Sequence, residues 1–567
     1  MPAARASKAS YYLFAATVLL LLFEFTWFGR NSLRGIDYDG MAYIGIARHL
    51  RQGNFHAAIN AFRSPLLSGI IALIPGRNYL LAGKAVNILA FLACAALLYL
   101  FTLRLWRSTL TASIAVLLFA LARGFVPSAV GSVVPDFLFA ALTLIYFIVL
   151  LLCLRETDSD GAAFQKTSWR PWLLLGIIHG LAYLAKAFAL PWLALSTVIA
   201  VLLSRGTMKQ RSRRLAAAAL IPVVIALAWA VVLHSKYGVF TTGSQFKANL
   251  LQWTLREYPR HRQSTYTLLR DTTEEVDNYL VDDPMPPGSW AWSYRVDLRQ
   301  AIPKLIAAEE HNLPGLLKEI LIVVTPGGLL AFIVAAVIVM RRRSQYPSEW
   351  RTVATIVASA ITLVFAYSML VFDARYLYPL IPLLLAVAAR FLIPARLLNN
   401  DDWNHASWRI VATALLVAGE IAALGYGSSP FRKLNRDFQI SCYAAGNHLK
   451  MHHGATVISL GSGPFPEHGV GWEAGYKAAF FANQRLIAAL DDLPASVNTS
   501  AALADLAKAS PDAIIVWGRP GDASYLAFTQ SLSHHYPDAP SEEISDPVLG
   551  SVASILFLKP GRSQQNQ

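Results

Sequence analysis

Two carboxylates, Asp37 and Asp39, stand directly after the first apolar segment of the chain, and basic residues follow them. Arg48 and Arg51 come next, ahead of the sequence Arg63-Ser-Pro-Leu. A carboxylate can accept the proton of an attacking hydroxyl, and cations can hold a phosphate and offset the charge that grows on it. Acids and cations beside an apolar segment therefore suit a substrate that carries both a phosphate and a lipid chain.

Further ionisable residues stand at the ends of other apolar segments. Asp136 begins one such segment, and Lys186 lies at the junction of two. A cation deep in a membrane costs about 2.5 to 3.5 kcal/mol unless it pairs or reaches the interface, so we interpret Lys186 as a ligand of a phosphate. Lys84 and Arg375 fall on the same predicted side of the membrane.

Simpler interpretations also exist for the acidic residues. Asp39 can serve as a helix N-cap, which contributes about 1 kcal/mol. Asp136 can stabilise the dipole at the start of its helix. Asp373 can pair with Arg375 in the same turn. A cap needs only one carboxylate, and the neighbouring cations favour a chemical role for Asp39.

The composition of the chain is that of a membrane protein. Of 567 residues, 55% are apolar and 15% are charged, which is too hydrophobic for a soluble protein of this length. Roughly eleven segments have the length of about 18 to 25 apolar residues that crosses a hydrocarbon core. They are residues 11–29, 79–103, 109–125, 134–154, 171–186, 187–204, 215–234, 317–340, 352–371, 376–394 and 409–426. We therefore predict a polytopic α-helical membrane protein.

Basic residues predict the orientation of these segments, because Lys and Arg in short loops stay on the cytoplasmic side. Alternate connections are strongly basic, notably residues 205–214 and 341–343. Together with Arg5 and Lys8, they place the N-terminus inside and the C-terminus outside. The first loop is an exception, because its arginines lie on the predicted external side. An anionic ligand or lipid headgroups would account for them.

The formal charge of +14 follows mainly from these loops, and the sequence contains no basic-aromatic module for nucleic acid. No nucleic-acid partner is expected. Two of the three cysteines, Cys94 and Cys153, fall in spanning segments, and Cys442 falls outside them. They are unable to form a disulfide framework or a metal cluster.

We predict a membrane domain over residues 1–427 and a small α/β domain over residues 428–567. The membrane domain includes two external loops, 30–78 and 235–314. The second of these loops is too long for a simple connector, and we expect it to fold over something.

The first loop carries helix signals. Asp37 or Asp39 can cap a helix that ends near Gly53, and such a helix should lie flat at the membrane interface. A second short helix is expected over residues 56–62. In the tail, strand-like runs alternate with helical ones, which is typical of a small α/β domain. The strand-like runs are 456–460, 513–517 and 552–558, and the helical runs are 472–482, 500–509 and 523–533.

These motifs give the chain a resemblance to the GT-C superfamily of integral-membrane glycosyltransferases. The nearest branch is the bacterial one related to protein O-mannosyltransferases and the aminoarabinose transferase of lipid A. The matching places are Asp39-x3-Tyr43-x3-Ala47-x5-Gly53 with Arg63-Ser-Pro-Leu66, Asp136, Gly180-Leu-Ala-Tyr-Leu-Ala-Lys186, and Arg375-Tyr-Leu-Tyr-Pro379. One departure is that many members have Asp-Glu in the first loop, whereas Gly40 follows Asp39 here. This leaves Asp37 as the second carboxylate.

The resemblance implies inverting transfer of a sugar from a polyprenyl-phosphate donor to an acceptor on the external face. It implies that Asp39 is the base and that Asp37 and Asp136 are supporting acids. The residues that it implies for the donor phosphate are Lys84, Lys186, Arg375, Arg63 and Tyr376. Members differ in needing a metal, so the resemblance leaves open whether Asp37, Asp39 and Asp136 hold a divalent cation.

The implied partners are a polyprenyl-phosphate-linked sugar, a glycan, lipid or protein acceptor, and membrane lipids. The loop 235–314 would close over the donor, and the tail would shape the acceptor side. The basic loops suit a bacterial inner membrane, with the C-terminal domain in the periplasm.

Two other functions stay open. A polytopic flippase or transporter of a lipid carrier would also place cations against a headgroup, but the sequence shows neither internal repeats nor charges through several mid-membrane segments. An oligosaccharide polymerase or ligase would carry catalytic arginine and histidine in its long outer loop, where residues 256–262 stand.

Overall fold

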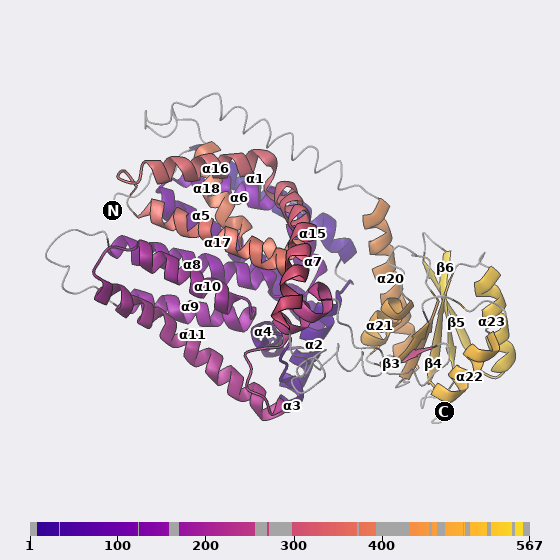
Figure 1. Ribbon diagram of the computed structural model, residues 1–567. Coiled ribbons are helices and arrows are strands. Elements are labelled where there is room, and N and C mark those ends of the chain that lie inside the picture. The colour runs from indigo at the N-terminus through magenta and orange to yellow at the C-terminus, as the bar shows by residue number, and fades with distance from the viewer. Residues whose placement is uncertain are drawn as a thin grey trace. The chain divides into compact units, whose positions relative to one another are not determined.

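The structure is a computed structural model, and the chain divides into two compact units (Figure 1). The first unit comprises residues 1–30, 43–257 and 285–426, and the second comprises 31–42, 258–284 and 427–567. The structure describes residues 8–32, 35–76, 78–122, 124–157, 169–255, 269–271, 297–346, 348–370, 373–392, 430–452, 456–461, 471–482, 484–490, 493, 499–518, 523–546 and 550–558.

The first unit is helical. Its long helices are α1 (Lys8–Ser32), α5 (Tyr79–Trp106), α8 (Asp136–Glu156), α11 (Met208–Tyr237), α15 (Leu298–Val324), α16 (Pro326–Arg341) and α17 (Glu349–Leu370). Shorter helices are α3 (Phe55–Ala58), α4 (Pro65–Leu73), α6 (Thr109–Leu121), α7 (Phe125–Gly131), α9 (Arg170–Ala185), α10 (Ala189–Leu203), α12 (Gln245–Asn249) and α18 (Ile381–Leu392). A π-helical turn, η2 (Leu250–Thr254), and a 3-10 turn, η3 (Ala374–Leu377), complete the unit. Helix α2 (Tyr38–Arg51) begins in the second unit and ends in the first.

The helices account for the predicted membrane segments. Among the described residues, five helices are long and apolar enough to cross a membrane, and two bent pairs raise the number to as many as seven. The apolar helices α9, α10 and α18 are shorter. Most predicted segments overlap a single helix, whereas 317–340 spans two helices and 409–426 lies outside the described residues. The fold is therefore that of a polytopic helical membrane protein, as predicted.

One predicted segment, 317–340, is not a continuous helix. Helices α15 and α16 meet at an angle of 94° at Thr325, whose φ is 63°. Pro326 follows as the first residue of α16, and the Thr325 hydroxyl accepts a hydrogen bond of 3.2 Å from the amide of Gly328. The prediction failed because proline cannot continue the α15 hydrogen-bond ladder but suits the start of a new helix.

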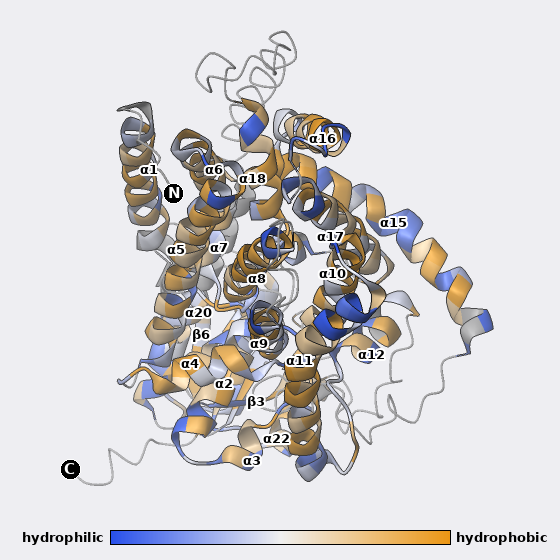
Figure 2. Ribbon diagram, turned by 90° about the vertical axis from the view of Figure 1, so that its left-hand side faces the viewer, coloured by the Kyte–Doolittle hydropathy of each residue, from blue (hydrophilic) through white to orange (hydrophobic). Residues whose placement is uncertain are grey.

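Helix α8 lies at the centre of the first unit (Figure 2). Of its most apolar stretch, 83% is buried, compared with 6% for α1 and 22% for α11. Two indole N–H groups form hydrogen bonds between helices. Trp106 of α5 donates to the carbonyl of Ala386 in α18 at 2.7 Å, and Trp192 of α10 donates to the carbonyl of Ser359 in α17 at 2.9 Å. A buried N–H needs an acceptor, because the membrane interior offers none.

The second unit contains a mixed six-stranded sheet in the order β1-β3-β2-β4-β6-β5. The strands are β1 (Arg270–Asp271), β2 (Thr456–Leu460), β3 (Arg485–Leu490), β4 (Ala513–Trp517), β5 (Ser541–Asp546) and β6 (Gly550–Phe557). Strands β3, β2 and β4 are parallel, and the others add antiparallel. Helices α20 (Pro430–Met451) and α21 (Gly471–Ala482) cover one face, and α22 (Thr499–Ala509) and α23 (Ala523–His535) cover the other (Figure 1).

This sheet confirms the small α/β domain and extends it. The predicted strands correspond to β2, β4 and β6, whereas β3 and β5 were not predicted. Strand β1 comes from the long loop 235–314 and pairs with β3. The amide of Leu269, just before β1, donates to the Asp505 carboxylate at 3.1 Å. Part of the long loop therefore belongs to the sheet of the tail, while residues 256–268 and 272–296 of this loop lie outside the described residues.

Two histidines one turn apart, His448 near the end of α20 and His452 just after it, hold one carboxylate on β5. His448 Nδ1 lies 2.7 Å from Glu542 Oε2, and His452 Nε2 lies 2.9 Å from Glu542 Oε1. Burial opposes ionisation of the carboxyl, but the hydrogen bonds from the two histidines outweigh it and hold the pKa of Glu542 below its usual value.

We expect Glu542→Gln to lower the thermal stability of the purified full chain at neutral pH and to lose this effect in acid. A carboxyl with a lowered pKa contributes stability above its unfolded pKa, and the contribution disappears as the pH falls through the folded pKa. Melting temperatures measured from pH about 7 to pH about 3.5 should therefore converge for the two proteins. Glu543→Gln, on the exposed side of the same strand, is the control. A constant gap between Glu542→Gln and the native chain would contradict the assignment.

Candidate active site

The predicted interfacial helix is α2, and its cap is Asp37. The amide of Gly40 donates to Asp37 Oδ1 at 3.2 Å, which is the bond expected from the third helical residue to an N-cap. Asp39 is the second residue of the helix and lies in its first turn. Capping of α2 therefore accounts for the carboxylate of Asp37 but not for that of Asp39. Both residues belong to the segment 31–42, which clusters with the second unit.

Helix α2 ends as predicted at Gly53. This glycine has a φ of 76°, and the amide of Asn54 donates to the carbonyl of His49 at 2.9 Å. Together with the bond from the Gly53 amide to the carbonyl of Leu50 at 3.2 Å, this forms a Schellman motif. The left-handed backbone at this position favours glycine.

Helix α2 is more deeply buried than a helix lying flat on a membrane surface. Ile44 and Ala47 are fully buried, and the Ser68 hydroxyl donates to the carbonyl of Tyr43 at 2.9 Å. At its far end, Arg51 donates to the carbonyl of Ile74 at 3.1 Å. The predicted amphipathic interfacial helix is therefore packed inside the protein along most of its length.

Lys186 and Asp136 form a buried ion pair. The Lys186 Nζ donates to Asp136 Oδ1, and the exposed fractions of the two side chains are 8% and 3%. Asp136 is the first residue of α8, and Lys186 follows the last residue of α9. An unpaired charge at this depth would be strongly destabilising, whereas a paired one is tolerated. The pair connects the start of the central helix to the turn between α9 and α10.

Aromatic rings surround this pair. The Lys186 Nζ lies 4.4 Å from the ring centroid of Tyr376, within range of a cation–π interaction. Tyr376 stacks on Tyr367 with centroids 4.5 Å apart, and Phe188 packs on Tyr367 at 4.6 Å. Elements far apart in the sequence, the α9–α10 turn, α17 and η3, thus meet at the ion pair.

Arg375 pairs with Asp373, as the simpler interpretation of this turn predicted. The Arg375 Nε donates to Asp373 Oδ2 at 2.7 Å, and the amide of Arg375 donates to Asp373 Oδ1 at 3.1 Å. Asp373 is thereby also the cap of η3. Both side chains are partly exposed, at 26% and 35%. The Arg375 guanidinium lies 6.0 Å from the Tyr376 ring, which places it beside the Lys186 group.

Lys84 is buried against the end of a neighbouring helix. Its Nζ donates to the carbonyl of Gly131, the last residue of α7. Asn87, one turn further along α5, donates to the carbonyls of Ala129 at 3.1 Å and Ser132 at 3.0 Å. The last carbonyls of a helix have no partner within it, so Lys84 and Asn87 satisfy those of α7. Sequence reasoning missed Asn87, although a polar residue one turn from Lys84 in an apolar segment is a usable signal.

Arg63 lies in a tight turn made by Asn60. The Asn60 Oδ1 accepts hydrogen bonds from the amides of Phe62 at 2.9 Å and Arg63 at 2.6 Å. The Arg63 guanidinium lies over the Phe62 ring at 4.3 Å, and the residue is 8% exposed. The second predicted short helix is limited to α3, which ends at Ala58 because the chain becomes extended at Ile59.

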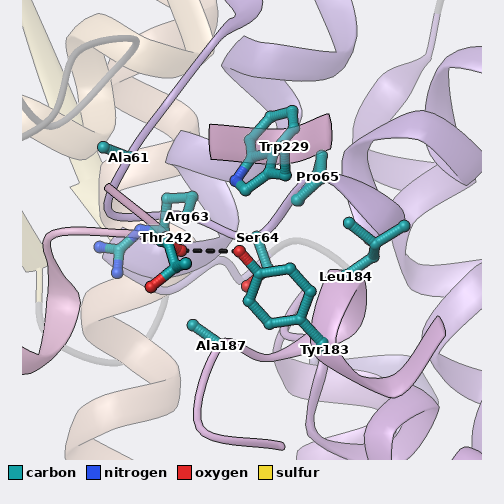
Figure 3. Close-up of a pocket in the computed structure, with 9 residues that line it drawn as sticks. All are labelled: Ala61, Arg63, Ser64, Pro65, Tyr183, Leu184, Ala187, Trp229 and Thr242. Carbon is teal, nitrogen blue, oxygen red and sulfur yellow. Dashed lines mark hydrogen bonds between the residues drawn. The ribbon is translucent and has the colours of Figure 1, made fainter. Parts of the chain in front are cut away.

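A small pocket adjoins Arg63. Its lining consists of Ala61, Arg63, Ser64, Pro65, Tyr183, Leu184, Ala187, Trp229 and Thr242. The Tyr183 hydroxyl donates to the carbonyl of Thr242 at 2.8 Å (Figure 3). Leu184 and Ala187 flank the Lys186 turn in sequence, so the pocket and the ion pair share the α9–α10 junction.

The structure thus brings together part of the predicted set. Asp136, Lys186 and Tyr376 are in direct contact, and Arg375 adjoins them. Lys84 is held at the α7 end, Arg63 lies in the Asn60 turn, and Asp37 and Asp39 stand at the start of α2. Sequence reasoning also missed the supporting rings of Tyr367 and Phe188. Among the described residues, no three His, Cys, Asp or Glu side chains are arranged to hold a metal ion.

Comparison with known proteins identifies solved structures that share the fold of this chain. No protein-family model matches the chain, and no curated protein matches it significantly. The oligosaccharyltransferase of Archaeoglobus fulgidus, in complex with Zn and sulfate, is similar over 95% of this chain and 72% of its own, at 13% identity and a TM-score of 0.53. ArnT from Cupriavidus metallidurans in the apo state is similar over 97% of this chain and 98% of its own, at 13% identity and a TM-score of 0.49. ArnT bound to undecaprenyl phosphate gives a TM-score of 0.48 at the same identity and coverage.

At such identities a structural likeness concerns the fold. The match to the oligosaccharyltransferase extends through the helical unit and into the tail, since it covers 95% of the chain. The chain therefore shares the fold of the Archaeoglobus fulgidus oligosaccharyltransferase.

Proposed function

We propose that this protein is an inverting glycosyltransferase that moves a sugar from a polyprenyl-phosphate donor to an acceptor on the external face of the membrane. The observation that carries the proposal is the buried Asp136–Lys186 ion pair beside Tyr376 and Arg375. It sets cations at a junction of apolar helices, which is where a phosphate attached to a lipid would lie. The oligosaccharyltransferase-like fold supports the same reaction class.

Lys186 and Arg375 are the groups that hold the phosphate. Each is kept in place by a carboxylate, Asp136 in one case and Asp373 in the other. An ammonium has three donors and a guanidinium five, so both groups can bind phosphate oxygens while keeping a carboxylate contact. As the sugar leaves, negative charge grows on the phosphate, and fixed cations lower the free energy of that state.

Asp39 is the general base. Its place in the first turn of α2 favours the ionised carboxylate, because the N-terminal end of a helix dipole stabilises negative charge. A base must be ionised to take the proton of the acceptor hydroxyl. Asp37 is already engaged by the Gly40 amide and supports the helix rather than the reaction.

Lys84, Arg63 and Tyr376 have secondary roles in this proposal. Tyr376 positions the Lys186 ammonium through the cation–π contact. Lys84 contributes its charge from a fixed position on the Gly131 carbonyl, and Arg63 does so from the Asn60 turn. Whether Asp37, Asp39 and Asp136 hold a divalent cation is decided by assaying transfer after chelation and after restoring Mg²⁺, Mn²⁺ or Zn²⁺.

The proposed setting is a bacterial inner membrane, with a cytoplasmic N-terminus and the C-terminal domain in the periplasm. The partners are a polyprenyl-phosphate-linked sugar, a glycan, lipid or protein acceptor, and membrane lipids. Mass spectrometry of cell-envelope glycans from cells with and without the protein would identify the sugar and its acceptor.

We expect Asp39→Asn to reduce transfer by a factor of about 10² to 10⁴, because a positioned general base contributes this much to a rate. The envelope glycans of cells that carry this variant should match those of cells lacking the protein. Retention of polyprenyl phosphate by the purified variant should be unchanged.

Asp37→Asn is the matched control for this substitution. Asparagine caps a helix as well as aspartate does, so the helix stays intact while one carboxylate is removed. We expect transfer within a few-fold of the native value. Equal losses in Asp37→Asn and Asp39→Asn would reject the assignment of the base, and an Asp39→Asn variant that leaves the envelope glycans of its cells unchanged would favour a flippase.

We also expect substitutions in the ion pair to affect the stability of the protein and its transfer activity differently. Asp136→Asn and Lys186→Gln should each lower the stability of the protein by about 3 to 5 kcal/mol, because each leaves a buried charge without its partner. The double variant has no buried charge and should recover much of this loss in thermal unfolding, yet it should stay inactive. Transfer at the native rate by the double variant would exclude the pair from the reaction.

A further inference from the structure

Helix α11 has two faces that run its full length. The protein-facing series is Arg214, Ala218, Pro222, Ala226, Ala230 and Leu233, all of which are buried. The spacing of three to four residues is that of one side of an α-helix. The opposite side contains exposed apolar residues: Leu220 at 56%, Val224 at 52%, Leu227 at 61% and Val231 at 58%. In a protein that spans a membrane, this exposed series contacts lipid chains.

The exposed series continues into basic residues at the start of the helix. Counting back from Leu220 in helical steps reaches Arg213 and Lys209, which are both exposed. Figure 2 looks onto this end of the helices, and it shows hydrophilic colour at the start of α11 and hydrophobic colour beyond it. One face of a single helix thus combines two cations with a long apolar track.

The other arginines of this segment have a structural task. Arg214 Nη1 donates to the Ser204 hydroxyl at 2.9 Å, and Arg211 Nε donates to the Ser204 carbonyl at 3.2 Å. They hold the turn between α10 and α11. In contrast, neither Lys209 nor Arg213 has an ion-pair partner among the residues that the structure describes, and the first turn of α11 contains no acidic residue.

The basic end of this face lies far from the candidate active site. The last turn of α11 contacts the first loop, where Lys236 donates to the carbonyl of Ile59 at 2.7 Å. Lys209 is at the other end of a helix of 30 residues, which is roughly 45 Å long at 1.5 Å per residue. The two ends of α11 therefore belong to opposite faces of the membrane.

We propose that this face of α11 binds an anionic glycerophospholipid in the leaflet opposite the active site. The phosphate of the headgroup binds Lys209 and Arg213, and an acyl chain lies along Leu220, Val224, Leu227 and Val231. Basic residues near an anionic membrane surface attract such lipids, and the apolar series supplies a surface for one chain. Neutral and zwitterionic lipids cover the apolar series equally well but lack the net charge that complements the two cations.

Native mass spectrometry of the purified full chain in detergent micelles tests the proposal. The probes are dioleoylphosphatidylglycerol and dioleoylphosphatidylcholine. We expect the native chain to retain phosphatidylglycerol preferentially, and we expect Lys209→Gln/Arg213→Gln to weaken its binding roughly 30-fold. Phosphatidylcholine binding should not change.

The matched control is Arg341→Gln/Arg343→Gln. It removes the same charge from two exposed residues at the end of α16 and the turn that follows. This control should retain native phosphatidylglycerol binding. An equal loss in the control, or no loss in the α11 variant, would overturn the proposal.

Two further measurements apply to the native chain and do not depend on the folding of any variant. Raising the salt concentration should reduce the preference for phosphatidylglycerol over phosphatidylcholine, because the cations are exposed. Soluble glycerol phosphate, which has the headgroup charge without acyl chains, should fail to displace the lipid. A preference that does not respond to salt, or displacement by glycerol phosphate, would reject an amphiphile site on this face.

Discussion

The buried ion pair between Asp136 and Lys186 is the interaction on which the organisation of the helical unit depends. Removing two charges from water is costly, and the membrane interior makes the cost larger. The two charges are tolerated because they neutralise each other and both groups stand at helix ends, where α8 begins and α9 stops. The pair fixes the start of the central helix against the α9–α10 turn. The Tyr376 ring lies against the Lys186 ammonium, and Tyr367 and Phe188 pack in turn behind it.

A second constraint follows from broken helices. Short helices within a membrane protein leave carbonyls that water does not reach, and each needs a donor. Lys84 and Asn87 supply donors for α7, and Lys236 supplies one for the segment after α3. Lys84 and Lys236 thus each have a structural partner.

The same reasoning separates the two carboxylates of the first loop. Asp37 is a cap, because its oxygen accepts the Gly40 amide. Asp39 is two residues further, at the second position of the helix. An acid without a capping role in the first turn of a buried helix is a stronger candidate for chemistry than the motif alone suggested. The geometry of the cap, not the spacing of the acids, makes this distinction.

Local patterns in the sequence were sufficient for most of the membrane segments, the ends of α2 and most of the tail, because hydrophobic length, capping residues and glycine act on near neighbours. They also located the acids and cations at helix ends. Only the tertiary structure decided that Lys186 pairs with an acid 50 positions away, that α7 takes its donors from α5, and that β1 joins the sheet of the tail. These contacts depend on which surfaces meet when helices and strands pack. The pattern of residues along the chain does not specify which of these surfaces pack together.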